Sequence, residues 1–137
     1  MGNETKEIQK SNNITLLDYQ NLVEQGLLPD GKTILEILPT LLILQQNKEL
    51  FYGDSWRKRG HLSAFMNLAR KFDRMERMFS EAVNNSGVDE LFDENQFETF
   101  LDTVADLTVY GLLWTSFIAK EHPGLWEKFL KSNRLNK

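Results

Sequence analysis

Apolar residues recur along this chain with the three- and four-residue spacing of amphipathic helices, and the pattern predicts an all-α fold. Two hydroxyl residues followed three positions later by an acid, Thr15 with Asp18 and Thr33 with Glu36, predict helix starts. The second of these helices is expected to kink at Pro39. The predicted helices cover residues 15–26, 33–49, 61–83 and 95–120, followed by a short helix that starts at Pro123. Asp30-Gly31 is expected to form a turn, 51–60 a loop, and 89–94 a loop or short turn.

The segment 61–83 has the clearest amphipathic pattern. At 100° per residue, one apolar stripe contains Phe65, Leu68, Phe72, Met75, Phe79 and Ala82. Arg70, Arg74 and Arg77 lie on the opposite side, where arginines are usually solvated. We therefore expect the stripe to be buried against the long helix 95–120, and a left-handed glycine, Gly87, to follow the helix end.

The long helix carries a strip of carboxylates. Glu98, Asp102 and Asp106 recur every fourth residue and share one face, which continues into Val109 and Leu113. The apolar continuation indicates partial burial, where acids about 6 Å apart repel by roughly 3 kcal/mol. Oxygen ligands without histidine or thiol favour Mg²⁺ or Mn²⁺, so Asp102 and Asp106 are metal-ligand candidates. Glu98, in the first turn, is expected to be structural, and a solvated acidic strip is the alternative for all three.

The chain of 137 residues fits one domain, expected to be a single bundle of four to five helices over 14–137 behind a loosely ordered tail, 1–13. The polar tail lacks the apolar core of a secretion signal, and no apolar run reaches the length of a membrane span. Without cysteine, disulfides and thiolate metal sites are excluded. We expect a soluble cytoplasmic protein, in the host cytosol if a phage encodes it. Leu125, Trp126 and Phe129 are expected to cover one end of the bundle.

Charge is strongly segregated along the sequence. Seven Lys or Arg residues lie between Arg57 and Arg77, whereas eight Asp or Glu residues and no Lys or Arg lie between Glu81 and Asp106. The net charge of −4 argues against general nucleic-acid binding. The two surfaces must face a ligand or each other, and the second arrangement would form an ion-pair network without any ligand.

The segment 51–60 and the basic helix supply ligand-binding candidates. Tyr52 and Trp56 offer rings on which a base could stack, and Asp54 could bind a ribose hydroxyl or a metal. Lys71 and Arg74 lie at the edge of the basic face that can turn inward to bind phosphate. Aromatic residues in a loop are more often packed against a core.

Several enzyme classes are excluded by the motifs. The only histidines are His61 and His122, without the His-Asp pair of metal-dependent phosphohydrolases, and there is no P-loop or nucleophile elbow. His61 is expected to be a helix-start residue rather than a base.

Three segments, FYGDSWRKRG, NLARKFDRMERM and FETFLDTVADLTVYGLL, resemble the nucleotide-modification-associated domain family of bacteriophages over residues 51–114. The resemblance is carried by Tyr52, Gly53, Trp56, Lys71, Arg74, Asp102, Asp106 and Tyr110. It implies a nucleotide-handling protein and adds Tyr110 to the ligand-binding candidates.

The acidic long helix is also similar to one element of the all-α nucleoside triphosphate pyrophosphatases of the MazG and dimeric dUTPase type, which hold Mg²⁺ between two helices. This chain departs from that pattern, because an earlier Glu-x-x-Glu pair is missing and only Glu36, or Glu76 and Glu81, stand in its place. Half of the usual metal cage is therefore absent.

The leading hypothesis is a phage-type protein that binds a nucleotide or phosphorylated nucleoside. As an enzyme, it would use Mg²⁺ on Asp54, Asp102 and Asp106 to polarise a phosphoanhydride, with Lys71 and Arg74 neutralising charge. The alternatives are a non-catalytic protein that sequesters a nucleotide, for example a host signalling nucleotide, and a structural helical adaptor. A homo-oligomer is compatible with each.

Overall fold

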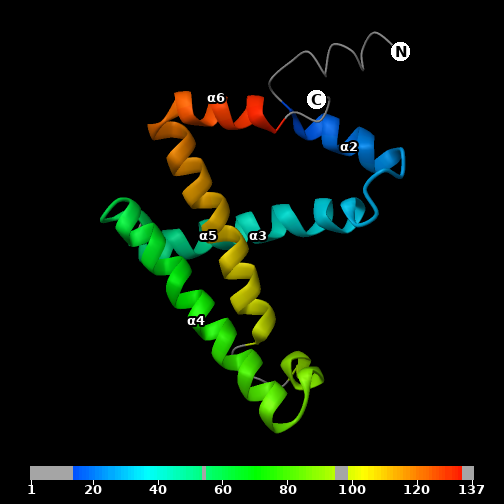
Figure 1. The fold of residues 1–137 in the computed structure, drawn as a ribbon, viewed down its shortest axis with the longest axis vertical. Coiled ribbons are helices and arrows are strands. Elements are labelled where there is room, and N and C mark those ends of the chain that lie inside the picture. The colour runs from blue at the N-terminus through cyan, green and yellow to red at the C-terminus, as the bar shows by residue number, and fades with distance from the viewer. Residues whose placement is uncertain (1–13, 54, 95–98, 134–137) are drawn as a thin grey trace. The chain divides into compact units, whose positions relative to one another are not determined.

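The all-α class is confirmed. The computed structural model describes residues 14–53, 55–94 and 99–133, with the backbone alone for 49–52, and contains no strand among them. The α-helices are α2 (Leu16–Glu24), α3 (Gly31–Tyr52), α4 (His61–Asn85), α5 (Phe100–Glu121) and α6 (Pro123–Ser132), joined in part by the 3₁₀ helices η1 (Ser55–Arg57) and η2 (Val88–Phe92) (Figure 1). The expected tail 1–13 lies outside the described residues.

The chain divides into two compact units. One consists of Met1–Thr40 with Ile118–Lys137, and the other is Leu41–Phe117. The helices α3 and α5 each contribute to both units.

In the first unit, the predicted start of α2 is confirmed. The backbone N–H of Thr15 donates to Asp18 Oδ2 at 2.7 Å, and the N–H of Asp18 donates to Thr15 Oγ1 at 3.3 Å. These reciprocal bonds satisfy two donors that a helix start leaves open. Gly26 follows the helix with a φ of 73°.

The start of α3 differs from the prediction. The helix begins at Gly31, so Thr33 lies inside the first turn rather than at the cap, and Asp30-Gly31 leads directly into the helix. Gly31 is buried, and a Cβ there would collide with Val23 of α2. The absence of a side chain therefore allows α2 to approach the first turn of α3. Pro39 lies within α3, as expected.

The terminal helix α6 begins at Pro123 as predicted. Leu125, Trp126 and Phe129 were expected to cover the bundle, but all three are exposed. The rings of Trp126 and Phe129 stack on each other with centroids 5.3 Å apart. Side chains three residues apart are neighbours on a helix surface, so these two rings can cover part of each other without contact to a core.

In the second unit, α4 covers the predicted segment, but the expected stripe is rotated. Phe65, Phe72 and Phe79 are 53%, 48% and 46% exposed. The inward face instead contains the buried Ala64 and Ala82, with Leu68, Lys71 and Met75 partly buried. The periodicity identified the helix but not its rotation, because the aliphatic part of a lysine packs well against apolar surface. Gly87, at a φ of 99°, follows the helix end as expected, and α4 packs against η1 and η2.

The long helix α5 begins later than predicted. Its described start is Phe100, preceded by Thr99, whose hydroxyl accepts from the backbone N–H of Asp102 at 3.1 Å. Asn95 and Glu98 lie outside the described residues. Thr103 and Val109 are buried, whereas Leu112, expected on a helix packed all round, is exposed.

An aromatic cluster joins α5 to η1 and to the start of α4. Trp56 meets Phe117 edge to face with centroids 6.0 Å apart, and His61 stacks on Phe117 at 4.5 Å. The indole N–H of Trp114 donates to His61 Nδ1 at 3.0 Å. His61 is the first residue of α4 and has a packing role there, in agreement with its predicted place at a helix start.

Candidate functional site

A cavity of about 540 Å³ lies within the second unit, between the end of α3, η1, α4 and α5. Ligand pockets of small molecules typically have volumes in this range. Its walls are formed by Gln45, Lys48, Gly53, Ser55, Trp56, Asn67, Arg70, Lys71, Arg74, Asp102, Thr103, Asp106 and Tyr110.

Most of the predicted site residues meet at this cavity although they are far apart in the sequence. Those that line it are Trp56, Lys71, Arg74, Asp102, Asp106 and Tyr110. Asp54 and the side chain of Tyr52 lie outside what the structure describes. The binding roles of all these residues stay predictions, but six of the eight now share one concave surface.

The predicted loop 51–60 is largely helical. Its first two residues end α3, and Ser55–Arg57 form η1. Trp56 is only 6% exposed, with its ring edge against Phe117 and the guanidinium carbon of Arg57 5.5 Å from its centroid. Protein groups therefore cover most of the ring, and the stacking of a base on it stays a prediction. The indole N–H of Trp56 is buried and has no hydrogen-bond partner among the described residues.

Asp106 is held by two lysines. Lys71 Nζ lies 2.8 Å from Oδ2 and Lys48 Nζ lies 3.1 Å from Oδ1. The side chains of Asp106 and Lys71 are 18% and 16% exposed, whereas that of Lys48 is 53% exposed. Burial alone would raise the pKa of Asp106, but the hydrogen bonds and charges of Lys71 and Lys48 outweigh it and lower the pKa below its ordinary 3.8. The ion-pair arrangement considered from the sequence is thus present between α4 and α5, and α3 contributes to it.

Asp102 has a different structural partner. Its Oδ2 accepts from the Thr99 hydroxyl at 2.9 Å and from the Thr99 backbone N–H at 3.1 Å. Together with the bond from the Asp102 N–H to Thr99, this forms a capping box at the start of α5. Asp102 is exposed and Asp106 is paired, so the two candidate metal ligands are engaged in separate interactions.

The cavity lining carries a net positive charge. Lys48, Arg70, Lys71 and Arg74 line it together with the two acids Asp102 and Asp106, which leaves positive groups in excess by two. Arg70 donates to Asn67 Oδ1 at 3.1 Å, and Asn67 in turn donates to the Ser63 carbonyl at 3.0 Å. A guanidinium group that donates to one acceptor, as Arg70 does, still has several N–H groups that can bind an anion.

The lining also contains neutral polar groups. Gln45 and Thr103 are buried, at 8% and 2% exposure, and line the cavity together with Trp56. The Thr103 hydroxyl makes a long contact of 3.9 Å to Met78 Sδ. Buried amide, hydroxyl and indole groups at a cavity are the groups that orient a polar ligand.

Sequence reasoning missed Gln45, Lys48 and Thr103. Gln45 and Lys48 are three residues apart and share one face of α3, and Thr103 lies one turn before Asp106 on α5. The sequence of α3 does not distinguish that face, because the apolar residues of this helix lie on several of its sides. The spacing on α5 does indicate a shared surface once Asp106 is known to face inward.

Comparison with known proteins gives one phage relative. The chain is 29% identical over 128 residues to "Gene 30 protein" of Bacillus phage SP01, an alignment that covers 84% of this chain. The same alignment covers 56% of the phage protein, so the chain spans little more than half of that relative's length. No protein-family model matches the chain, and no solved structure matches it.

Within the described ranges, no helix combines the length and the apolar character needed to cross a bilayer.

Proposed function

We propose that this protein binds a nucleotide or phosphorylated nucleoside in the cavity lined by α3, η1, α4 and α5. The observation that carries the proposal is the composition of the cavity lining, which combines four cations with neutral hydrogen-bonding groups. A nucleotide carries the matching groups, since its phosphate is anionic and its sugar and base offer neutral hydrogen-bonding groups.

Phosphate binding is assigned to Lys71 and Arg74, with Lys48 and Arg70 beside them. The guanidinium group of Arg74 binds phosphate through paired N–H donors, and Lys71 acts as a point charge. Lys71 is largely buried, so a phosphate there would interact in a lower dielectric than at the surface.

Base or sugar recognition is assigned to Trp56, Thr103 and Gln45. The indole N–H of Trp56 is a buried donor without a partner among the described residues, and such a group costs free energy until it is satisfied. A ligand carbonyl or ring nitrogen that accepts this bond would recover that free energy. Tyr110 adds a phenol to the same lining.

Binding without hydrolysis is favoured over Mg²⁺-dependent turnover. Asp106 accepts from two lysines, and Asp102 caps α5. A metal would have to displace these interactions before it could bind the carboxylates. The similarity to a phage protein supports the phage-type part of the hypothesis, and sequestration of a nucleotide is the function that needs no metal cage.

The test is a thermal-shift screen of nucleoside mono-, di- and triphosphates, followed by calorimetric titration of every compound that raises the melting temperature. A ligand at 100 times its dissociation constant stabilises the folded state by about 2.7 kcal/mol. The screen is run with and without Mg²⁺, because a response that requires Mg²⁺ would favour hydrolysis.

Variants place the ligand in the cavity. Arg74→Gln should weaken binding about tenfold or more, because a charged hydrogen-bond donor to phosphate is lost. Lys58→Gln is the matched control, since Lys58 is exposed and does not line this cavity. If no nucleotide shifts the melting temperature, or if both variants weaken binding equally, the cavity is not a nucleotide site.

A further inference from the structure

The outer face of α4 carries a row of large apolar side chains that are about half exposed. Their exposed fractions lie between 46% and 63%, and the residues are Leu62, Phe65, Phe72, Phe79 and Val83. Apolar side chains scattered singly are ordinary on a protein surface, whereas a contiguous row of them is typical of a surface that binds another molecule. These five residues are called the apolar seam below.

The seam has the spacing of a helix–helix contact. With the two residues between its members included, the row consists of Leu62, Phe65, Ala69, Phe72, Glu76, Phe79 and Val83. The intervals in this row alternate between three and four residues, which keeps one face of a helix turned toward a partner helix at a crossing angle of about 20°. The seam is therefore suited to a second helix that follows α4 for about 30 Å.

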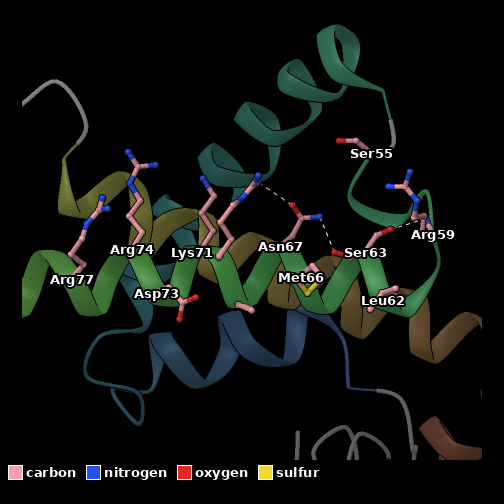
Figure 2. A pocket seen from close by; sticks show the side chains of 12 residues that line it. Ser55, Arg59, Leu62, Ser63, Met66, Asn67, Lys71, Asp73, Arg74 and Arg77 are labelled. Carbon is pink, nitrogen blue, oxygen red and sulfur yellow. Dashed lines mark hydrogen bonds between the residues drawn. The ribbon is translucent and has the colours of Figure 1, made fainter.

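The seam and the cavity lie on different sides of α4. Phe72 and Arg74 are two residues apart, which is a rotation of about 200° around the helix axis. Figure 2 shows Lys71, Arg74 and Arg77 on one side of α4, whereas Leu62, at one end of the seam, points away from them. None of the five seam residues is among the described residues that line the cavity. A partner bound to the seam therefore leaves the cavity lining accessible.

The seam is symmetric about Phe72. Phe65 and Phe79 lie seven residues before and after it, and Leu62 and Val83 lie ten before and eleven after. Two copies of α4 packed antiparallel therefore place Phe72 against Phe72, Phe65 against Phe79, and Leu62 against Val83. A twofold interface requires this self-complementarity, because both copies use the same patch.

Charge also favours a second copy in the antiparallel orientation. Lys58 and Arg59 are exposed and come shortly before α4, whereas η2, which follows α4 and packs against it, carries Asp89 and Glu90. Antiparallel pairing brings the basic start of each copy toward the acidic end of the other, and twofold symmetry repeats that attraction. Parallel pairing would bring like charges together.

The area of the seam is that of a small interface. A buried aromatic side chain covers about 150–250 Å², so the three half-exposed rings offer about 300 Å². Leu62 and Val83 raise this to about 400 Å² per copy, or about 800 Å² in a pair. The bordering Met66, Ala69 and Glu76 bring the pair to the roughly 1,000 Å² that a specific interface needs. In the antiparallel register Glu76 faces Ala69 of the second copy, whose small side chain leaves the carboxylate room to reach solvent.

We infer that the apolar seam of α4 is the contact of a symmetric, antiparallel homodimer centred on Phe72. The inference goes beyond nucleotide binding and does not depend on it. Because the interface is small, the dimer should dissociate on dilution, with a dissociation constant of about 1–100 µM.

The first test is sedimentation equilibrium of the full chain over a range of concentrations. The mass should approach twice the 16.0 kDa of one chain at high concentration and fall toward one chain on dilution. Phe72→Lys should weaken the dimer about tenfold or more, since two like charges then face each other at the twofold axis. Leu44→Lys is the matched control, because Leu44 is similarly exposed, at 52% against 48%, and lies on α3 rather than on the seam.

In dilute solution, where the chain is a monomer, Phe72 stays half exposed, and its substitution carries only the cost expected for such a ring. The fold of both variants is checked by circular dichroism. A parent that sediments as one chain at all concentrations overturns the inference, and the seam is then covered by a different protein or by another segment of this chain. An equal effect of the two variants overturns it as well.

The second test uses the absence of cysteine from the chain. Phe72→Cys should give disulfide-linked dimers on mild oxidation, because the Cα atoms at the twofold axis can approach the roughly 4.4–6.8 Å of a disulfide. Phe79→Cys alone should not, since the antiparallel register holds its two copies about 21 Å apart along the helices. An equal mixture of Phe65→Cys and Phe79→Cys should again cross-link. Equal cross-linking of Phe72→Cys and Phe79→Cys would indicate parallel or non-specific association and overturns the inference.

Discussion

Replacing Asp106 with asparagine keeps the shape of the side chain and removes the charge that Lys71 and Lys48 share. The effect on stability follows from burial. Lys48 is 53% exposed and its pair with Asp106 contributes at most about 1 kcal/mol, as for other surface pairs. Lys71 is 16% exposed, and a stranded cation at a fully buried site costs about 3–5 kcal/mol. Because some solvent reaches this pair, we expect Asp106→Asn to destabilise the protein by about 2–3 kcal/mol.

The measurement is thermal and urea unfolding of the parent and the variant. At this chain length, about 3 °C of melting temperature corresponds to 1 kcal/mol, so a decrease of about 6–9 °C is expected. Asp73→Asn is the control, because Asp73 is an exposed acid in the middle of α4 and should melt within about 1–2 °C of the parent.

Other roles of Asp106 predict a different direction for the change in stability caused by Asp106→Asn. If the acidic strip were only a repulsive surface, Asp106→Asn would leave stability unchanged or raise it. If Asp106 held a metal, the parent would gain stability on addition of Mg²⁺ and the variant would lose that gain. A variant that melts with the parent would refute the ion-pair reasoning, whatever the response to Mg²⁺.

The pH dependence provides an independent measurement of the same pair. The lysines hold the folded-state pKa of Asp106 below its ordinary value of 3.8. The ionised carboxylate therefore contributes its stability above about pH 4, and that contribution is lost as the pH falls through the lowered pKa. The stability difference between the parent and Asp106→Asn should be constant near neutral pH and shrink in acid. A difference that grows as the pH falls would contradict the direction of the pKa shift.

Three further substitutions test the packing. Gly31→Ala should destabilise by about 1–3 kcal/mol in urea unfolding because the new methyl collides with Val23, although helix propensity alone would favour alanine; equal or greater stability would refute that contact. Thr99→Ala should cost about 1 kcal/mol by removing the cap that Asp102 completes, whereas Thr108→Ala, an exposed site within the same helix, should cost less. Phe72→Ala should cost about 1–2 kcal/mol in thermal unfolding rather than the 3–5 kcal/mol or so of a buried ring, because Phe72 is half exposed; a larger loss would restore the stripe expected from the sequence.

The helices could be predicted from the sequence because their signals are local. The capping box at Thr15 lies in the first turn of the helix that it starts, and the pattern of α4 repeats over many turns. The predicted starts of α3 and α5 were Thr33 and Asn95, whereas the helices begin at Gly31 and Phe100. In both cases the sequence offers more than one plausible capping residue. A tertiary contact favours the earlier start of α3, since Gly31 lets α2 approach the helix two residues before Thr33.

The rotation of α4 and the members of the cavity depend on contacts that are distant in sequence. Lys48 and Asp106 are 58 positions apart, and through this pair α3 contacts the same carboxylate that Lys71 of α4 contacts. The sequence did indicate that Lys71 and Arg74 could turn inward and that a basic and an acidic face could meet. It indicated that a loop aromatic such as Trp56 could pack against a core, but not that Phe117 would be the residue in contact with its ring.

Every described residue that lines the cavity belongs to the continuous segment Leu41–Phe117, whereas the other compact unit is assembled from residues on both sides of it. One continuous part of the sequence therefore encodes the cavity, and among the described residues neither flank contributes to its lining. Relatives of this protein can diverge, lengthen or exchange their flanking segments while they keep the same cavity-lining side chains. A comparison of relatives that tests the proposed ligand selectivity should therefore use this central segment alone.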